Sequence, residues 1–251
     1  MTTVQDIVRF LDSIAPFDTQ ESWDNSGLLV GSAAQEVTVA ALALDITTET
    51  AAMAKQAGAQ VLISHHPVIF YPIKRVPASD PVYALAAAGL TAVCAHTNLD
   101  AAQGGVNDCL AQLLGLENVE TLPTPSGGSI LRRGTLPKEL NAREFGVLVS
   151  EKLGSPAAVA DGGRPIRTVA VCGGAGGEFA EEVADLADAL VTGEAKHHQY
   201  LLARQLGLTL VTAGHFETEN PVIAPLAERL RRAFPNVTFR VLDEPNPVFY
   251  C

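Results

Sequence analysis

The sequence has 251 residues, of which 47% are hydrophobic and 18% charged, a globular balance that excludes bulk disorder. Its 17 basic and 28 acidic side chains give a formal net charge of −11. That charge disfavours nucleic acid as the main ligand and an anionic membrane as a binding surface. The four cysteines are far apart and form no CxxC, so neither a zinc ribbon nor a disulfide framework is indicated. Asp6 and Asp12 interrupt the region where a signal peptide would be apolar, so we expect a soluble cytoplasmic protein.

The first half of the chain alternates strand and helix patterns. Apolar spacing and a capping pattern at Thr3 and Asp6 predict the first helix. Asp80, Pro81 and Gly89 have the residue types that begin and end another. The predicted helices cover residues 4–14, 47–57, 80–89 and 106–114. The predicted strands cover residues 27–31, 37–44, 60–63 and 91–95.

The second half repeats the pattern after a cluster of Pro, Ser and Gly at residues 122–128. Strands are expected over residues 167–172, 189–191, 208–212 and 237–242. Helices are expected over 139–153, from 178, between 191 and 208, and over 218–233. Alternation of this kind predicts an α/β fold with mostly parallel sheets flanked by helices. We expect two α/β lobes, residues 1–125 and 126–251, with the C-terminal segment able to return to the first lobe.

Five of the six histidines fall into three short clusters, and each cluster follows or lies near a predicted strand end. His65 and His66 follow Ser64, which comes directly after the strand that ends in the sequence VLI. Ligands of open α/β sheets bind outside the carboxyl ends of the strands. Adjacent side chains on a regular strand point to opposite faces, so both rings reach one site only if the chain leaves the strand there. An exposed turn with two accidental histidines is the alternative.

The next strand leads into the sequence HTNLD, which holds His96 and Asp100. Asp100 is either a metal ligand or a helix N-cap, and the residues alone favour the cap. A third strand leads into GHFETE, where His215 and Glu219 are four residues apart and share one face of a helix. Glu217 would then point elsewhere. Imidazole and carboxylate at strand ends are a ligand set for zinc, iron or manganese.

Two other polar segments lie near predicted strand ends. The glycine run at residues 172–177 matches neither dinucleotide nor P-loop spacing, so close backbone packing is favoured over phosphate binding. Glu194 follows another strand, and it or His96 is a candidate proton carrier. His197 and His198 lie in the following helix as surface or supporting groups. A serine hydrolase using Ser64 is disfavoured because no GxSxG surrounds it.

The whole set of motifs resembles the short form of the NIF-three-like family, whose members are often named GTP cyclohydrolase I type 2 homologues. The matching segments run in order along nearly the entire chain. They are WDNSGLLVG, ALDIT, ISHHPVIF, AHTNLDAAQGGVN, CGGAGG, VTGEAKHH, AGHFETE and EPNPV.

The resemblance implies a dinuclear centre in a cleft between two interlinked lobes, with two divalent ions (Zn, Fe or Mn) per chain. Carried over by position, its ligands are His65, His66, Asp100, His215 and Glu219. On this basis Asp100 is a ligand and Glu219 is preferred to Glu217. The resemblance also implies a ring-shaped homohexamer.

Two functions are expected from these residues and the resemblance. The first is a metal-dependent hydrolase in which metal-bound hydroxide attacks a nucleotide, GTP among the candidates, or another small anionic substrate. The second is a non-catalytic metal-binding or regulatory protein that binds a partner, because the family name records a protein interaction. The ligand types do not choose among the three metals.

Overall fold

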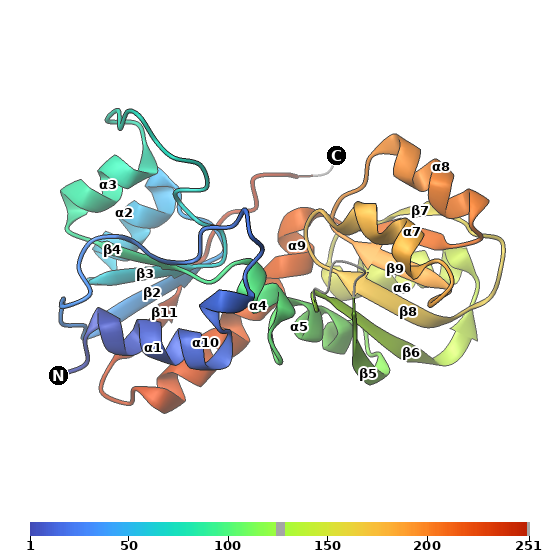
Figure 1. The fold of residues 1–251 in the computed structure, drawn as a ribbon, viewed down its shortest axis with the longest axis horizontal. Coiled ribbons are helices and arrows are strands. Elements are labelled where there is room, and N and C mark those ends of the chain that lie inside the picture. The colour runs from blue at the N-terminus through green and yellow to red at the C-terminus, as the bar shows by residue number, and fades with distance from the viewer. Residues whose placement is uncertain (124–128, 250–251) are drawn as a thin grey trace. The chain divides into compact units, whose positions relative to one another are not determined.

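The computed structural model describes residues 1–123 and 129–249, and the chain divides into two compact units (Figure 1). The first unit comprises Met1–Gln103 and Ile223–Pro245, and the second comprises Gly104–Val222 with the segment from Asn246 onward. The sequence places the boundary at 125/126, within residues 124–128 that lie outside the described residues. The observed division differs because the helix over residues 106–113 packs in the core of the second unit.

The first unit contains a five-stranded sheet in the order β1-β4-β3-β2-β11. Its strands are β1 (Gly27–Val30), β2 (Val39–Ala43), β3 (Val61–Ser64), β4 (Thr91–Cys94) and β11 (Thr238–Val241). Only β1 pairs antiparallel, so the sheet is mostly parallel, as predicted. Strand β11, which lies late in the chain, pairs in parallel with β2 of this sheet.

Helices cover both faces of this sheet (Figure 1). They are α1 (Val4–Ile14), α2 (Thr48–Gln56), α3 (Pro81–Ala88) and α10 (Ile223–Ala233). Short helical turns are η1 (Phe17–Thr19) and α4 (Thr97–Ala101). The predicted capping box is present at the start of α1, where the Thr3 hydroxyl accepts from the amide of Asp6. Alanines on α2 and on β2 pack together with Leu62 and Leu85, so small side chains bring that helix close to the sheet.

The second unit has a six-stranded sheet in the order β5-β6-β8-β9-β10-β7. Its strands are β5 (Glu117–Leu122), β6 (Leu131–Leu140), β7 (Ala158–Ala160), β8 (Ile166–Cys172), β9 (Ala189–Thr192) and β10 (Thr209–Thr212). Here the prediction of a mostly parallel sheet is wrong. Only β8-β9 and β9-β10 pair in parallel, because the unpredicted strands β5, β6 and β7 add antiparallel pairs at the edges.

The helices of the second unit are α5 (Val106–Leu113), α6 (Ala142–Leu153), η2 (Gly176–Phe179), α7 (Ala180–Val183), α8 (His197–Gln205), α9 (His215–Glu219) and η3 (Asn220–Val222). Alternate residues of β8 reach opposite layers of the core, as the pleat requires. Val169 and Val171 pack with Phe145 of α6, whereas Ala170 and Cys172 pack with residues of α7 and α8.

Two predicted helices differ from the observed ones. The helix expected from residue 178 is a short 3-10 turn followed by the four-residue α7. The long helix expected over 218–233 is divided into α9, η3 and α10, because Pro221 cannot continue an α-helical hydrogen-bond pattern. Across residues 1–123 and 129–249, the structure has no helix with the length and apolarity needed to cross a bilayer.

Candidate metal centre

In the first unit, His65 and His66 lie where the chain leaves β3. Strand β3 ends at Ser64, and the amides of both histidines donate to the same carbonyl, that of Leu44 (3.1 and 2.9 Å). This shared acceptor breaks the regular strand pattern, as the sequence required for both rings to reach one site. The ring centroids of His65 and His66 are 4.9 Å apart.

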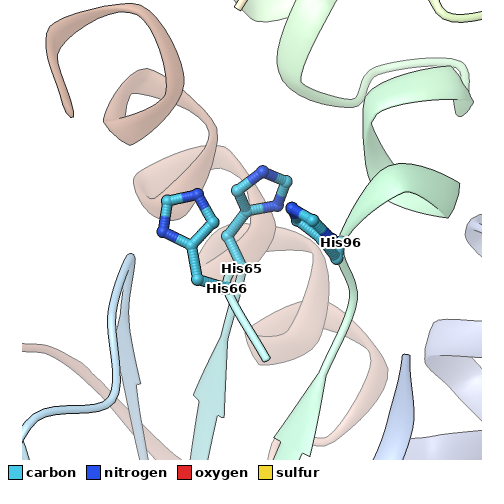
Figure 2. A group of neighbouring side chains, drawn as sticks. All are labelled: His65, His66 and His96. Carbon is cyan, nitrogen blue, oxygen red and sulfur yellow. The ribbon is translucent and has the colours of Figure 1, made fainter. Parts of the chain in front are cut away.

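His96 follows β4 and joins this pair. Its ring centroid lies 5.1 Å from that of His65 and 5.5 Å from that of His66 (Figure 2). One nitrogen from each of the three rings can be chosen so that all lie within 4.8 Å of one another. Asp100, a predicted ligand, belongs to the same unit. It lies inside α4, which His96 rather than Asp100 caps, and its Oδ1 is 3.5 Å from Nε2 of His65.

In the second unit, His215 and Glu219 are the first and last residues of α9. They share one face, and Nε2 of His215 lies 3.0 Å from Oε2 of Glu219. Two ligands each about 2.1 Å from one zinc ion at a tetrahedral angle lie about 3.4 Å apart. The separation in the pair His65–Asp100, 3.5 Å, is close to that spacing, and the separation in the pair His215–Glu219, 3.0 Å, is somewhat shorter. Glu217 instead accepts a hydrogen bond from Asn246.

The four histidines of these two sets share one feature, which is an oxygen acceptor at Nδ1. A ligating histidine nearly always donates its second ring nitrogen to a carboxylate or a carbonyl, which fixes the ring and leaves the lone pair on Nε2. The pairs are His65 with the carbonyl of Ala95 (3.0 Å), His66 with Asp45 (2.7 Å), His96 with Asp24 (2.8 Å) and His215 with Glu194 (2.9 Å). This donor set is suited to a borderline divalent metal.

The supporting carboxylates are held by further contacts. Burial raises the pKa of Asp24, but hydrogen bonds from His96 and Thr97 outweigh it and keep that pKa well below its ordinary value. Asp24 is therefore a buried anion at neutral pH. Glu244 accepts from the amides of Leu44 and Asp45, and its pKa is raised because it is partly buried. Glu244 thus fixes the backbone that carries the partner of His66.

Within residues 1–123 and 129–249, the groups that could hold a metal ion contain no cysteine. The buried Cys94 thiol donates to the carbonyl of His65 (2.9 Å), and burial raises its pKa well above the ordinary value. A protonated thiol is a poor metal ligand. His197 and His198, by contrast, are exposed in the first turn of α8, in agreement with their interpretation as surface groups.

Sequence reasoning missed Asp24 and Asp45 as supporting residues. Asp45 lies two residues after the end of β2, so its place near a strand end was an available signal. Asp24 lies in an irregular segment, residues 20–26, and only the WDNSG motif marked it.

The glycine run is closely packed, as the sequence predicted, and its contact with Glu219 gives a direct test of that residue. A Cβ at Gly174 would lie 2.1 Å from Oε1 of Glu219, and Gly174 has a φ of +63°. We expect Gly174→Ala to displace the Glu219 carboxylate and lower the metal content, at a stability cost of about 1–2 kcal/mol from the left-handed backbone. Gly154→Ala is the matched control, because Gly154 has a φ of +66° with no atom within 4 Å of its Cβ position. Elemental analysis and thermal unfolding of both variants would check this. Full metal content in Gly174→Ala would contradict it.

These features define a class, an α/β protein of two units whose strand ends carry a candidate metal-binding set. The chain belongs to the Duf34/NIF3 (NGG1p interacting factor 3) family, whose model matches residues 2–247. It is 30% identical to the "GTP cyclohydrolase 1 type 2 homolog" of Clostridium perfringens over 98% of both chains. It is 31% identical to the "NGG1-interacting factor 3" of Saccharomyces cerevisiae, over 84% of this chain and 85% of the yeast protein. The crystal structure of the Staphylococcus aureus hypothetical protein SA1388 is similar, with a TM-score of 0.92, 26% identity and 99% of each chain covered.

Proposed function

We propose that the chain is a dinuclear metal-dependent hydrolase that acts on a nucleotide or a related small anionic substrate. The proposed ligands are His65, His66, Asp100, His215 and Glu219. One observation carries the proposal, which is that every one of the three histidine ligands has its Nδ1 held by an oxygen, as ligating histidines do. The name of the Clostridium perfringens relative supports a nucleotide substrate.

The residues around these ligands have separable tasks. Divalent ions at the site would supply Lewis-acid chemistry and lower the pKa of bound water. Asp45 and Glu194 hold the imidazoles of His66 and His215 in place. His96, oriented by Asp24, is proposed to carry a proton at Nε2 to or from the reacting group.

The test is elemental analysis of unchelated protein together with a turnover assay on GTP. We expect about two zinc, iron or manganese ions per chain, and turnover that EDTA abolishes and the same ion restores. Protein that holds no metal, and takes up none of the three, would overturn the proposal. Light scattering on the same sample would test the ring-shaped hexamer that the family resemblance implies.

A second candidate function is partner binding, which the name of the yeast relative favours. The variant His66→Ala distinguishes the two functions. A hydrolase loses its turnover with the ligand, whereas a metal-independent partner-binding protein keeps its partner when the metal is gone.

A further inference from the structure

The segment Trp23–Asp24–Asn25–Ser26 is held firmly in the first unit, yet its tryptophan is exposed. Asn25 donates to the carbonyl of Ile69 (2.6 Å), and the Ser26 hydroxyl donates to Asn98 (2.9 Å). Asp24 holds His96. Three of the four residues are therefore tied to the two loops that carry the histidines. Trp23, the only tryptophan in the chain, is 57% exposed.

Trp23 forms one side of a group of rings that extends to His96. Its centroid is 5.7 Å from that of Phe70, and the centroids of Trp23 and Phe70 each lie 6.2 Å from that of His96. Tyr71, 74% exposed, contacts Phe70 edge to face at 4.7 Å. We call Trp23, Phe70 and Tyr71 the aromatic wall. Because it contacts His96, the wall is continuous with the proposed site.

The wall has the composition of a ring-binding surface. Folding favours burial of a tryptophan this large, so an exposed indole whose sequence neighbours are hydrogen-bonded in place beside the proposed site is suited to binding a ligand. Aromatic side chains stack on any planar base, and each stacked base contributes about 1–3 kcal/mol to the binding free energy. The same loop continues into Lys74 and Arg75, both exposed, in a chain whose net charge is −11. These cations suit an anionic group on the ligand.

We propose that the aromatic wall is a subsite for a planar heteroaromatic ring of the substrate, with Lys74 and Arg75 facing its anionic part. This rests on the proposed function, because it assigns the substrate class to that site. The proposed occupant of the aromatic wall is the ring of a small molecule. The alternative occupant, a second copy of this chain, is an outcome of the test.

Trp23 fluorescence reports on the subsite directly, because no other tryptophan contributes. The probes are GTP and guanosine, with inorganic triphosphate as the matched probe that lacks a ring. The titrations use the full chain in EDTA, and again after metal loading. We expect saturable quenching by GTP and guanosine in both conditions, and none by triphosphate. Phe70→Leu should weaken the fluorescence-derived affinity for GTP by roughly 5- to 100-fold.

Calorimetry extends the test to variants without the fluorophore. Trp23→Leu should weaken GTP binding over the same range and Trp23→Phe much less, while Tyr83→Leu, an exposed aromatic residue on α3, should bind GTP like the wild type. Thermal unfolding of each variant identifies any that fails to fold. The GTP affinities of the folded variants then decide whether the aromatic wall binds the ring.

The outcomes separate this inference from the proposed function. Quenching by GTP in a protein that binds no metal supports the subsite and contradicts the hydrolase. A metal-loaded, active protein with no saturable quenching by GTP or guanosine overturns the subsite alone. A Trp23 signal that changes with protein concentration, and not with either probe, assigns the wall to self-association and also overturns the subsite.

Discussion

Replacing His215 by alanine should remove both metal ions from the chain, and replacing His65 should do the same. His65 belongs to the first unit and His215 to the second. If the two ligand sets serve one dinuclear centre, the ions are coupled through shared ligands and loss of either set lowers the affinity for both. Elemental analysis of the two single variants would check this. We expect the content to fall from about two ions per chain to well below one in each.

The number of metal ions per chain in each variant distinguishes one dinuclear centre from two independent mononuclear sites. Two independent mononuclear sites would each lose one ion, and each variant would retain the other. His198→Ala is a suitable control, since His198 is an exposed histidine of the second unit outside the ligand set. Circular dichroism of all variants would show that the fold is retained. A variant that retains one full equivalent would refute the shared centre and leave two separate sites.

Much of the first unit could be predicted because its signals are local. The capping residues Thr3 and Asp80 and the stop at Gly89 mark helix ends by their own chemistry, and the observed helices follow them. Strand β6 shows why the second unit was harder to predict from the sequence. Its sequence LRRGTLPKEL carries charges that are typical of a loop, and its buried Arg132 pairs with Asp108 of α5. That partner is distant in sequence, so no local pattern could reveal it.

The candidate site divides in the same way, into residues with a local sequence signal and residues whose role depends on a distant contact. The places of His65 and His66 after a strand, and of His215 and Glu219 on one helix, could be predicted because strand ends and helical spacing are visible in the sequence. That of Asp24 could not, because its role depends on a contact with His96 across 72 residues. The resemblance named the WDNSG segment but gave it no task, and only the fold connects it to the histidines.

His96→Gln should keep the metal content and lower turnover by about 10²–10⁴-fold, the range of a lost general acid or base. Asp24→Asn should also lower turnover, because an amide does not fix the His96 proton on Nδ1 as the carboxylate does. The double variant should be little worse than His96→Gln alone, since the two residues act as one unit. Steady-state kinetics with elemental analysis of the three proteins would check this. Loss of metal in His96→Gln would make His96 a ligand instead.

The stability of Asp24→Asn gives a second, independent readout of the same pair. The folded protein holds the pKa of Asp24 below its ordinary value, so the carboxylate contributes stability above about pH 3.9 and loses it as the pH falls further. At pH 7 the variant should be less stable by about 1.5–3 kcal/mol, the usual range for hydrogen bonds to a charged group. The difference in unfolding free energy between the two proteins should narrow as the pH falls below about 4. Urea unfolding at pH 7 and in acid would measure it. A difference that does not change with pH would mean that Asp24 is not the buried anion that orients His96.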